Sequence, residues 1–164
     1  MRTDDPCLIF APPSLTQPVV VSQEKDARMV EELLKRLRST DQSVRLFAAV
    51  SLGSLGRRVQ AGLPALVGAL QDRDTQVRQV AVMAIACISP EAKMAIPALT
   101  EALKDEDALV RSQAATALGK MGADARAAIP ALWARHQDTN REVNKAVARA
   151  LGKIDPTGLK KAVG

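Results

Sequence analysis

The amino-acid sequence predicts an all-α fold, a right-handed α-solenoid of four two-helix repeats preceded by an extended arm. The first observation is a set of prolines that recur every 33 residues, at Pro64, Pro97 and Pro130. The second is a column of valines with the same spacing, at Val44, Val77, Val110 and Val143. A fixed period of this length indicates a repeat array, whose units must stack because one unit cannot bury its apolar face alone.

Composition supports the same fold and excludes several classes of site. Aromatic residues make up 2% of the 164 residues, so the core must consist of Ala, Leu, Val and Ile, which suits closely packed helices. The two cysteines are too few for a disulfide framework and favour a cytoplasmic location. His136 is the single histidine, so we expect no zinc site and no cofactor. We expect no membrane span, because no run of 18 apolar residues occurs.

Residues 1–22 differ from the rest of the chain. They contain four prolines and show no period, which predicts an extended arm. Asp4 and Asp5 stand where a signal peptide needs positive charge, so we expect no secretion signal. Two apolar clusters, residues 8–10 and 19–21, could pack on the first repeat. Docking of the arm and disorder of the arm both stay open.

The four repeats are expected at about 23–61, 62–94, 95–127 and 128–156. In the first, Ser22 caps a helix that runs to about Leu37. In the other three, a short helix of eight or nine residues starts near the periodic proline, which suits a first helical turn. The second helices are predicted at 42–55, 75–88, 108–121 and 141–154. Acids or amides in the turns before them are placed to cap their first N–H groups. Residues 157–164 form a short basic tail.

One motif recurs in the second helices, Asp-x-x-Val-Arg-x-x-Ala, beginning at Asp41, Asp74 and Asp107. A Leu-Gly-x-Leu/Met-Gly pattern follows it at 52–56 and 118–122. Together these motifs resemble the HEAT repeat, in the short bacterial form also called the phycobilisome-lyase HEAT-like repeat. The resemblance covers about residues 30–156. It is specific for the fold and weak for activity, because the family spans many roles.

The resemblance implies that the Asp and Arg of the motif form a polar ladder between neighbouring repeats. The ladder residues would then be Asp41, Arg45, Asp74, Arg78, Asp107 and Arg111. The alternative is a row of arginines that grips phosphates. The fourth repeat carries Asn140 and Asn144 at the two positions, which fits a last repeat with no neighbour to bridge.

In HEAT-like arrays the second helices line a concave binding surface. Counting 100° per residue, the side of each second helix opposite the core forms one stripe. We predict that its partner-binding members are Leu46, Val50, Gln79, Met83, Ser112, Thr116, Lys120, Lys145, Arg149 and Lys153. The stripe changes from apolar to basic along the sequence. Two simpler explanations stay open: the arm covers the apolar part, with Phe47, and the basic part is ordinary solvated charge.

Taken together, these features predict a non-enzymatic scaffold that binds a protein partner, such as an extended acidic or amphipathic segment. Nucleic acid is a weaker alternative, because the stripe has cations but no aromatic ring for stacking. An accessory subunit of a lyase-type complex is another. His136 is followed by Gln137, so the His-Glu iron ligands of HEAT-like hydroxylases are missing and no catalytic residue is assigned. Trp133 either shields the last repeat or anchors a partner, and Cys87 is interpreted as a partly exposed thiol.

Overall fold

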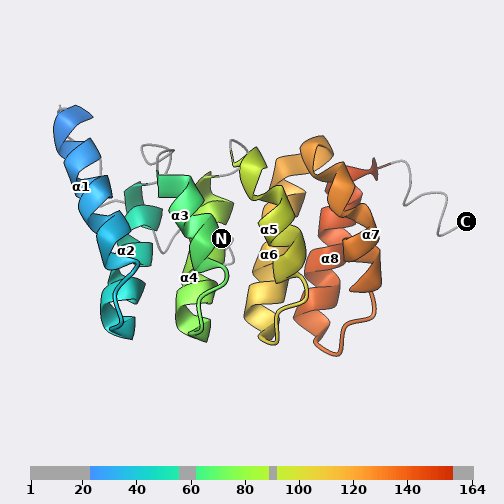
Figure 1. Cartoon of the computed structure of the whole chain (residues 1–164). Coiled ribbons are helices and arrows are strands. Elements are labelled where there is room, and N and C mark those ends of the chain that lie inside the picture. Colours follow the sequence, from blue (N-terminus) through green and yellow to red (C-terminus); the bar gives the residue numbers. More distant parts are fainter. Residues whose placement is uncertain (1–22, 56–61, 89–91, 157–164) are drawn as a thin grey trace, which may run out of the picture. The chain divides into compact units, whose positions relative to one another are not determined.

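The computed structural model describes residues 23–55, 62–88 and 92–156, and every regular element in these ranges is helical (Figure 1). The predictions for the arm at 1–22 and for the tail at 157–164 lie outside the described residues. The chain divides into a first unit, residues 1–87, and a second unit, residues 88–164. Each unit is described by itself.

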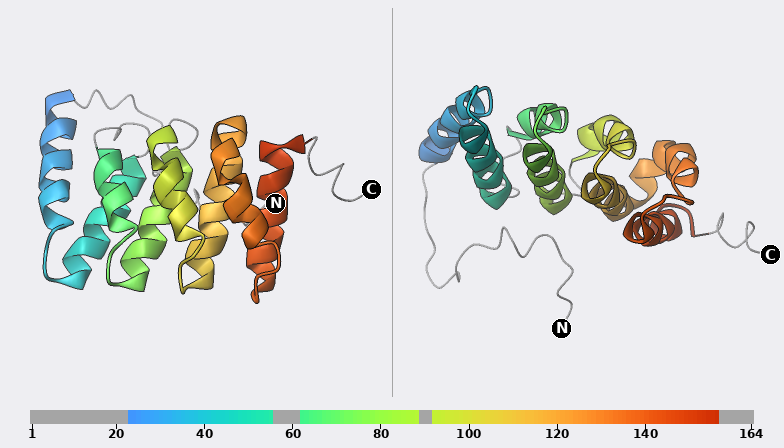
Figure 2. Two further views of the ribbon diagram at one scale, coloured as in Figure 1. Left: turned by 45° about the vertical axis from the view of Figure 1, so that its right-hand side comes forward. Right: turned by 90° about the horizontal axis from the view of Figure 1, so that it is seen from below.

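The first unit contains two successive helix pairs. The helices are α1 (Gln23–Arg36), α2 (Gln42–Leu55), α3 (Leu63–Ala69) and α4 (Thr75–Ile88), whose last residue belongs to the second unit. In this unit α1 and α3 lie on one side, while α2 and α4 lie on the other (Figure 2). Its core consists of aliphatic side chains and alanines from all four helices, including fully buried Leu52, Leu66 and Val77.

The second unit repeats this plan with two added 3-10 segments. Its elements are η3 (Lys93–Ala95), α5 (Ile96–Ala102), α6 (Ala108–Met121), η4 (Gly122–Ala128), α7 (Ile129–Ala134) and α8 (Arg141–Ile154). Helix α6 packs along α8, while α5 packs on α6 and α7 on α8. Within this unit α6 and α8 therefore form one side and α5 and α7 the other (Figure 2).

The four second helices begin and end at the predicted residues. The first helices are shorter than predicted, with seven, seven and six residues in α3, α5 and α7. Each starts one residue before its proline, which occupies the first turn as expected. The chain beyond α3 continues as a tight turn, in which the backbone N–H groups of Gln71 and Asp72 donate to carbonyls three residues earlier.

The 3-10 segments η3 and η4 are not predicted from the sequence. They bring Ala92, Ala95, Ala125 and Ala128 into the core, where all four are fully buried. These alanines form two columns with the 33-residue spacing. Gly122 begins the second connector with φ 57° and ψ −133°, a backbone conformation that favours glycine.

Capping of the second helices by the preceding turns is confirmed. The carboxylate of Asp107 accepts a hydrogen bond from the Val110 N–H at 2.9 Å, at the start of α6. The side-chain oxygen of Asn140 accepts from the N–H groups of Glu142 and Val143 at the start of α8. These bonds fix where each second helix begins.

Close contact between α6 and α8 depends on Gly119. A Cβ atom added to Gly119 would lie 2.9 Å from the Cα of Ala150 and 3.1 Å from its Cβ. The obstacle includes backbone, which no rotamer change can remove. We therefore expect Gly119→Ala to push α8 away from α6 and lower the free energy of unfolding by about 1–3 kcal/mol, measured by urea denaturation.

Gly68 of α3 provides the matched control, because nothing lies within 4 Å of a Cβ added there. Gly68→Ala should raise the free energy of unfolding by up to about 1 kcal/mol, since alanine is the better helix former. Equal and small effects of the two substitutions would show that the contact between Gly119 and Ala150 does not limit the approach of the helices.

Candidate functional site

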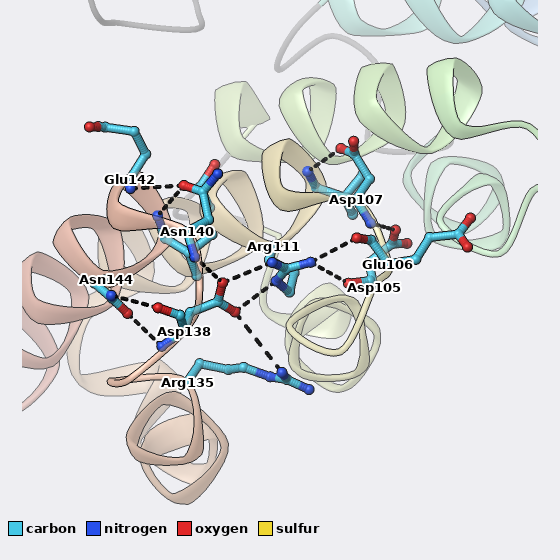
Figure 3. A network of polar contacts seen from close by, with 12 residues as sticks. Asp105, Glu106, Asp107, Arg111, Arg135, Asp138, Asn140, Glu142 and Asn144 are labelled. Atoms are coloured by element: carbon cyan, nitrogen blue, oxygen red, sulfur yellow. Dashed lines mark hydrogen bonds and ion pairs between the residues drawn. The ribbon is translucent and has the colours of Figure 1, made fainter.

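The guanidinium of Arg111 is a buried polar group of the second unit, and its residue is only 9% exposed. Its Nε and Nη2 donate to the two carboxylate oxygens of Asp138, at 2.9 and 2.8 Å. Its Nη1 donates to the backbone carbonyls of Asp105 and Glu106, at 2.8 and 2.9 Å. Arg111 thus closes the turn before its own helix and grips the turn before α8 (Figure 3).

Arg45 makes the same set of contacts in the first unit. Its Nε and Nη2 lie 2.8 and 3.0 Å from the carboxylate oxygens of Asp72. Its Nη1 donates to the carbonyls of Ser39 and Thr40, at 3.1 and 3.0 Å. Arg73 adds a bond of 2.9 Å to the same Thr40 carbonyl. In each unit, the described residues therefore include a bidentate Arg–Asp pair that joins the turn of one helix pair to the turn of the next.

The structure corrects the acids assigned to the ladder. The bidentate partner is the aspartate two residues before the motif, Asp72 or Asp138, rather than Asp74 or the Asn140 that replaces it. The motif aspartates Asp41 and Asp74 accept hydrogen bonds from the first N–H groups of α2 and α4, as Asp107 does in α6. A carboxylate that caps its own helix is directed toward that helix, which leaves the earlier aspartate to face the arginine of the preceding pair.

The carboxylates of both pairs are held ionised. The hydrogen bond from Arg111 lowers the pKa of Asp138 more than burial raises it, and the Asn140 N–H and the nearby Arg135 lower it further. For Asp72, burial raises the pKa, but the hydrogen bonds from Arg45 and the Asp74 N–H and the charge of Arg73 together lower it. Because Arg45 and Arg111 are buried and already bound to carboxylates, the hypothesis that this row grips phosphates is wrong for them.

Arg78 of α4 is also buried, at 8% exposed. Its Nη1 donates to the carbonyl of Asp72 at 3.0 Å, which is the turn-closing contact that Arg45 and Arg111 make in their own turns. A guanidinium buried in its own turn is not available to a phosphate. All three motif arginines therefore belong to the framework of the fold.

Asn144 occupies the arginine position of α8 and makes only half of these contacts. Its Nδ2 donates to the Asp138 carbonyl at 2.8 Å, and its Oδ1 accepts from the Asp138 N–H at 2.7 Å (Figure 3). It thus closes its own turn as the arginines do. The short amide cannot supply the charged bidentate grip that Arg111 gives to the turn that follows it.

None of the ten predicted stripe residues is buried. In the first unit Val50 is exposed, and Leu46, Gln79 and Met83 are half-buried. Phe47 beside them is 56% exposed, with the Arg36 guanidinium 6.0 Å from its ring centre. Exposed apolar side chains occur in the second unit too, at Met94, Leu109 and Trp133, but they lie outside the predicted stripe. That the stripes of all four helices form one concave surface stays a prediction.

In the second unit the stripe is polar on α6 and basic on α8. Ser112, Thr116 and Lys120 are half-buried, and the two hydroxyls donate to carbonyls of their own helix. On α8 a row of exposed cations, here called the basic row, consists of Arg141, Lys145, Arg149 and Lys153.

Arg141 was not predicted as a member of the basic row, although it stands four residues before Lys145. Successive members of the row are separated by about 6 Å along the helix axis. Glu142 is the one acid within α8, and its carboxylate lies 2.8 Å from the Lys145 Nζ. Lys145 thereby lowers the pKa of Glu142.

The first unit also has a hollow of about 440 Å³ between α1 and α3. Its walls include Leu34 and Leu37 of α1 and Pro64 and Gly68 of α3. The hollow exists partly because Gly68 has no side chain. No periodic signal in the sequence marks this hollow, since Gly68 has no glycine at the equivalent position of any other repeat.

Two kinds of site are absent from the described ranges. No cluster of three or more His, Cys, Asp or Glu side chains there is arranged to hold a metal ion. No helix in those ranges combines the length and the apolar character that a membrane crossing requires.

A family model described as HEAT repeats matches residues 30–95 and 63–152 of this chain. A comparison with curated protein sequences finds no match. Among solved structures, a designed armadillo repeat protein in complex with the peptide (KR)4 is similar, with a TM-score of 0.68 and 23% identity, over 82% of this chain and 70% of that chain.

Two natural proteins are also similar. The complex of CpcE and CpcF of phycocyanin lyase from Nostoc sp. PCC7120 gives a TM-score of 0.60 at 19% identity, over 80% of this chain and 81% of that chain. Human deoxyhypusine hydroxylase in complex with glycerol gives 0.58 at 26% identity, over 89% of this chain but 46% of that one. These likenesses show a repeat-solenoid fold, and the hydroxylase shows that an enzyme can share it.

Loss of the arginine in the second unit tests the ladder. In Arg111→Ala the buried carboxylate of Asp138 loses its bidentate partner, so the free energy of unfolding should fall by about 3 kcal/mol in a urea titration. Glu101→Ala removes an exposed ion pair with Lys104 and should cost less than about 0.5 kcal/mol. A similar small loss for both variants would contradict a structural role for the ladder.

Acid should weaken the same pair. Because the folded state lowers the pKa of Asp138 below its ordinary value of 3.8, its contribution to stability is complete above that value. The contribution is lost as the pH falls below 3.8 and through the lowered pKa. The free energy of unfolding of the parent chain should therefore fall more steeply between pH 4 and pH 2 than that of Asp138→Asn, and parallel curves would contradict the assignment.

Proposed function

The chain belongs to the HEAT repeat family, and on that premise we propose that it is a non-enzymatic scaffold or adaptor that binds a protein partner through its second helices. The observation that carries the proposal is the basic row of α8, four exposed cations in line on one helix face. Of these, Lys145 pairs with an acid of the same helix, and that pair is itself exposed to solvent. A partner with acidic side chains at helical or extended spacing would complement this row.

The charge pattern favours a protein segment over nucleic acid. Weak binding of a phosphate backbone needs only cations, but single strands also need aromatic rings for stacking, and the basic row contains none. Trp133, on α7, is the one tryptophan of the chain. An accessory role in a lyase-type complex rests only on the likeness to the phycocyanin lyase, which at 19% identity concerns the fold.

The proposal is tested with a defined probe, a fluorescein-labelled peptide of 14 residues. In this peptide, helical turns made of Glu alternate with helical turns made of Leu. We expect the parent chain to bind it, and Lys145→Glu with Arg149→Glu to bind it at least about tenfold more weakly, because attraction becomes repulsion. Fluorescence anisotropy at physiological salt measures the affinity.

The control is Lys35→Glu with Arg36→Glu, on exposed positions of α1, which changes the net charge equally. An equal loss of affinity in both double variants would mean that binding follows net charge and not the basic row. Tighter binding of a 14-nucleotide single strand than of the peptide, with a steep salt dependence, would favour the nucleic-acid alternative.

A further inference from the structure

Helix α6, on which α8 packs, and helix α8 itself carry the same small residues at equivalent repeat positions. On α6, Ala115 is fully buried and Gly119 meets Ala150 of α8. The residues 33 positions later, Ala148 and Gly152, are both exposed on α8. α8 therefore keeps the small residues with which α6 accepts a neighbouring helix, but no helix among the described residues covers them.

Trp133 lies at the same end of the second unit. It is 40% exposed on α7, and His136 is its ring neighbour at 5.2 Å. Its repeat position is that of Leu34 in α1, and Leu34 faces α3 across the hollow of the first unit. Trp133 thus occupies the position at which the first helix of one repeat faces the first helix of the next repeat. Its large aromatic side chain could anchor a partner there.

Charge specifies what the surface accepts. Arg141 and Lys145 border Ala148 and Gly152 on the α8 surface, and the rest of the basic row continues along the same helix. Asn144 lacks the charge with which Arg111 binds an aspartate of the following turn. A further repeat of the same kind would find no ladder arginine, whereas a helix with acidic side chains at its edges would meet cations.

We propose that this outer face of α7 and α8, made of Trp133, Asn144, Ala148 and Gly152 with Arg141 and Lys145 at its edge, docks an acidic α-helix of the protein partner. The partner helix places a small residue against Ala148 and Gly152, as Ala150 does against Gly119. This inference rests on the proposed function and names the site and the secondary structure of the bound segment.

Two other occupants fit the charge less well. A second copy docked face to face would bring its own basic row against this one, because a two-fold contact uses the same patch twice. Residues 157–164 of this chain carry Lys160 and Lys161 and no acid. Both would add positive charge to a surface that is already basic.

The test uses a probe built from α8 itself. A lactam-bridged peptide with the sequence of residues 141–154, in which the four cations of the basic row are replaced by Glu, keeps the surface that packs on α6. We expect it to bind the full chain and to shift the emission of Trp133, the single tryptophan, to shorter wavelength. The control peptide carries Leu in place of Ala150, which preserves charge but prevents close approach.

On the chain, Ala148→Gln adds a neutral, longer side chain at an exposed position, so the thermal unfolding midpoint should not change. We expect this variant to bind the acidic α8 peptide at least about tenfold more weakly, and the Leu control peptide to bind the parent equally poorly. These losses together with the Trp133 shift support docking at the outer face.

Other outcomes overturn the inference in distinguishable ways. If Lys145→Glu with Arg149→Glu abolishes binding while Ala148→Gln and the Trp133 emission show no change, the outer face is not the site and the proposed function stands. If neither the Glu and Leu peptide nor the acidic α8 peptide binds the parent chain, both the proposed function and the docking at the outer face are wrong. Self-association of the parent chain in sedimentation runs that Ala148→Gln prevents would replace the partner by a second copy. Peptide binding only after removal of residues 157–164 would identify the tail as the occupant.

Discussion

The buried guanidinium of a motif arginine is the constraint on which the rest of each unit depends. Taking a guanidinium out of water is costly unless each donor group finds an acceptor. Arg111 meets this requirement with two carbonyls of its own turn and both oxygens of Asp138. The turn before α6 and the turn before α8 must therefore keep their shapes and their separation. Removing one partner of such a pair is costly, because it leaves the other charge buried without a partner.

The Arg111 contacts fix the start of α6, and close packing against α8 fixes the part of α6 near its end. Arg111 stands in the first turn of α6, whereas Gly119 stands near its end, against Ala150 of α8. A core without large aromatic side chains lets the two helices approach until backbone atoms limit the contact. Two fixed points along one helix define both its position and its direction, so the short repeated motif is enough to specify how one pair stacks on the next.

Periodic residues made the fold predictable, and the same periodicity concealed which acid pairs with the arginine. The bounds of α2, α4, α6 and α8 follow from columns of buried residues and capping residues. Asp72 and Asp74, however, belong to columns with the same spacing, and spacing does not show where a side chain points. The η3 and η4 turns were not predicted because alanine is a strong helix former, so a buried alanine does not mark a 3-10 connector. The hollow beside Gly68 was missed because a single departure has no period.

Residues that depart from the repeat are therefore the ones free to serve a function particular to this chain. A residue that recurs in every pair has a role that every pair needs, and that role is the fold. Asn144, Trp133 and three cations of the basic row depart from their columns together, all on α7 and α8. The three cations are Arg141, Lys145 and Arg149. Asn144 keeps the bonds that close its own turn, so the exchange of arginine for asparagine leaves α8 well formed. What it removes is the charged contact that reaches beyond the pair. The outer face of α8 keeps the small residues that let a helix pack closely. It lacks the arginine that would bind the turn of another repeat, so it is suited to a helix of different chemistry.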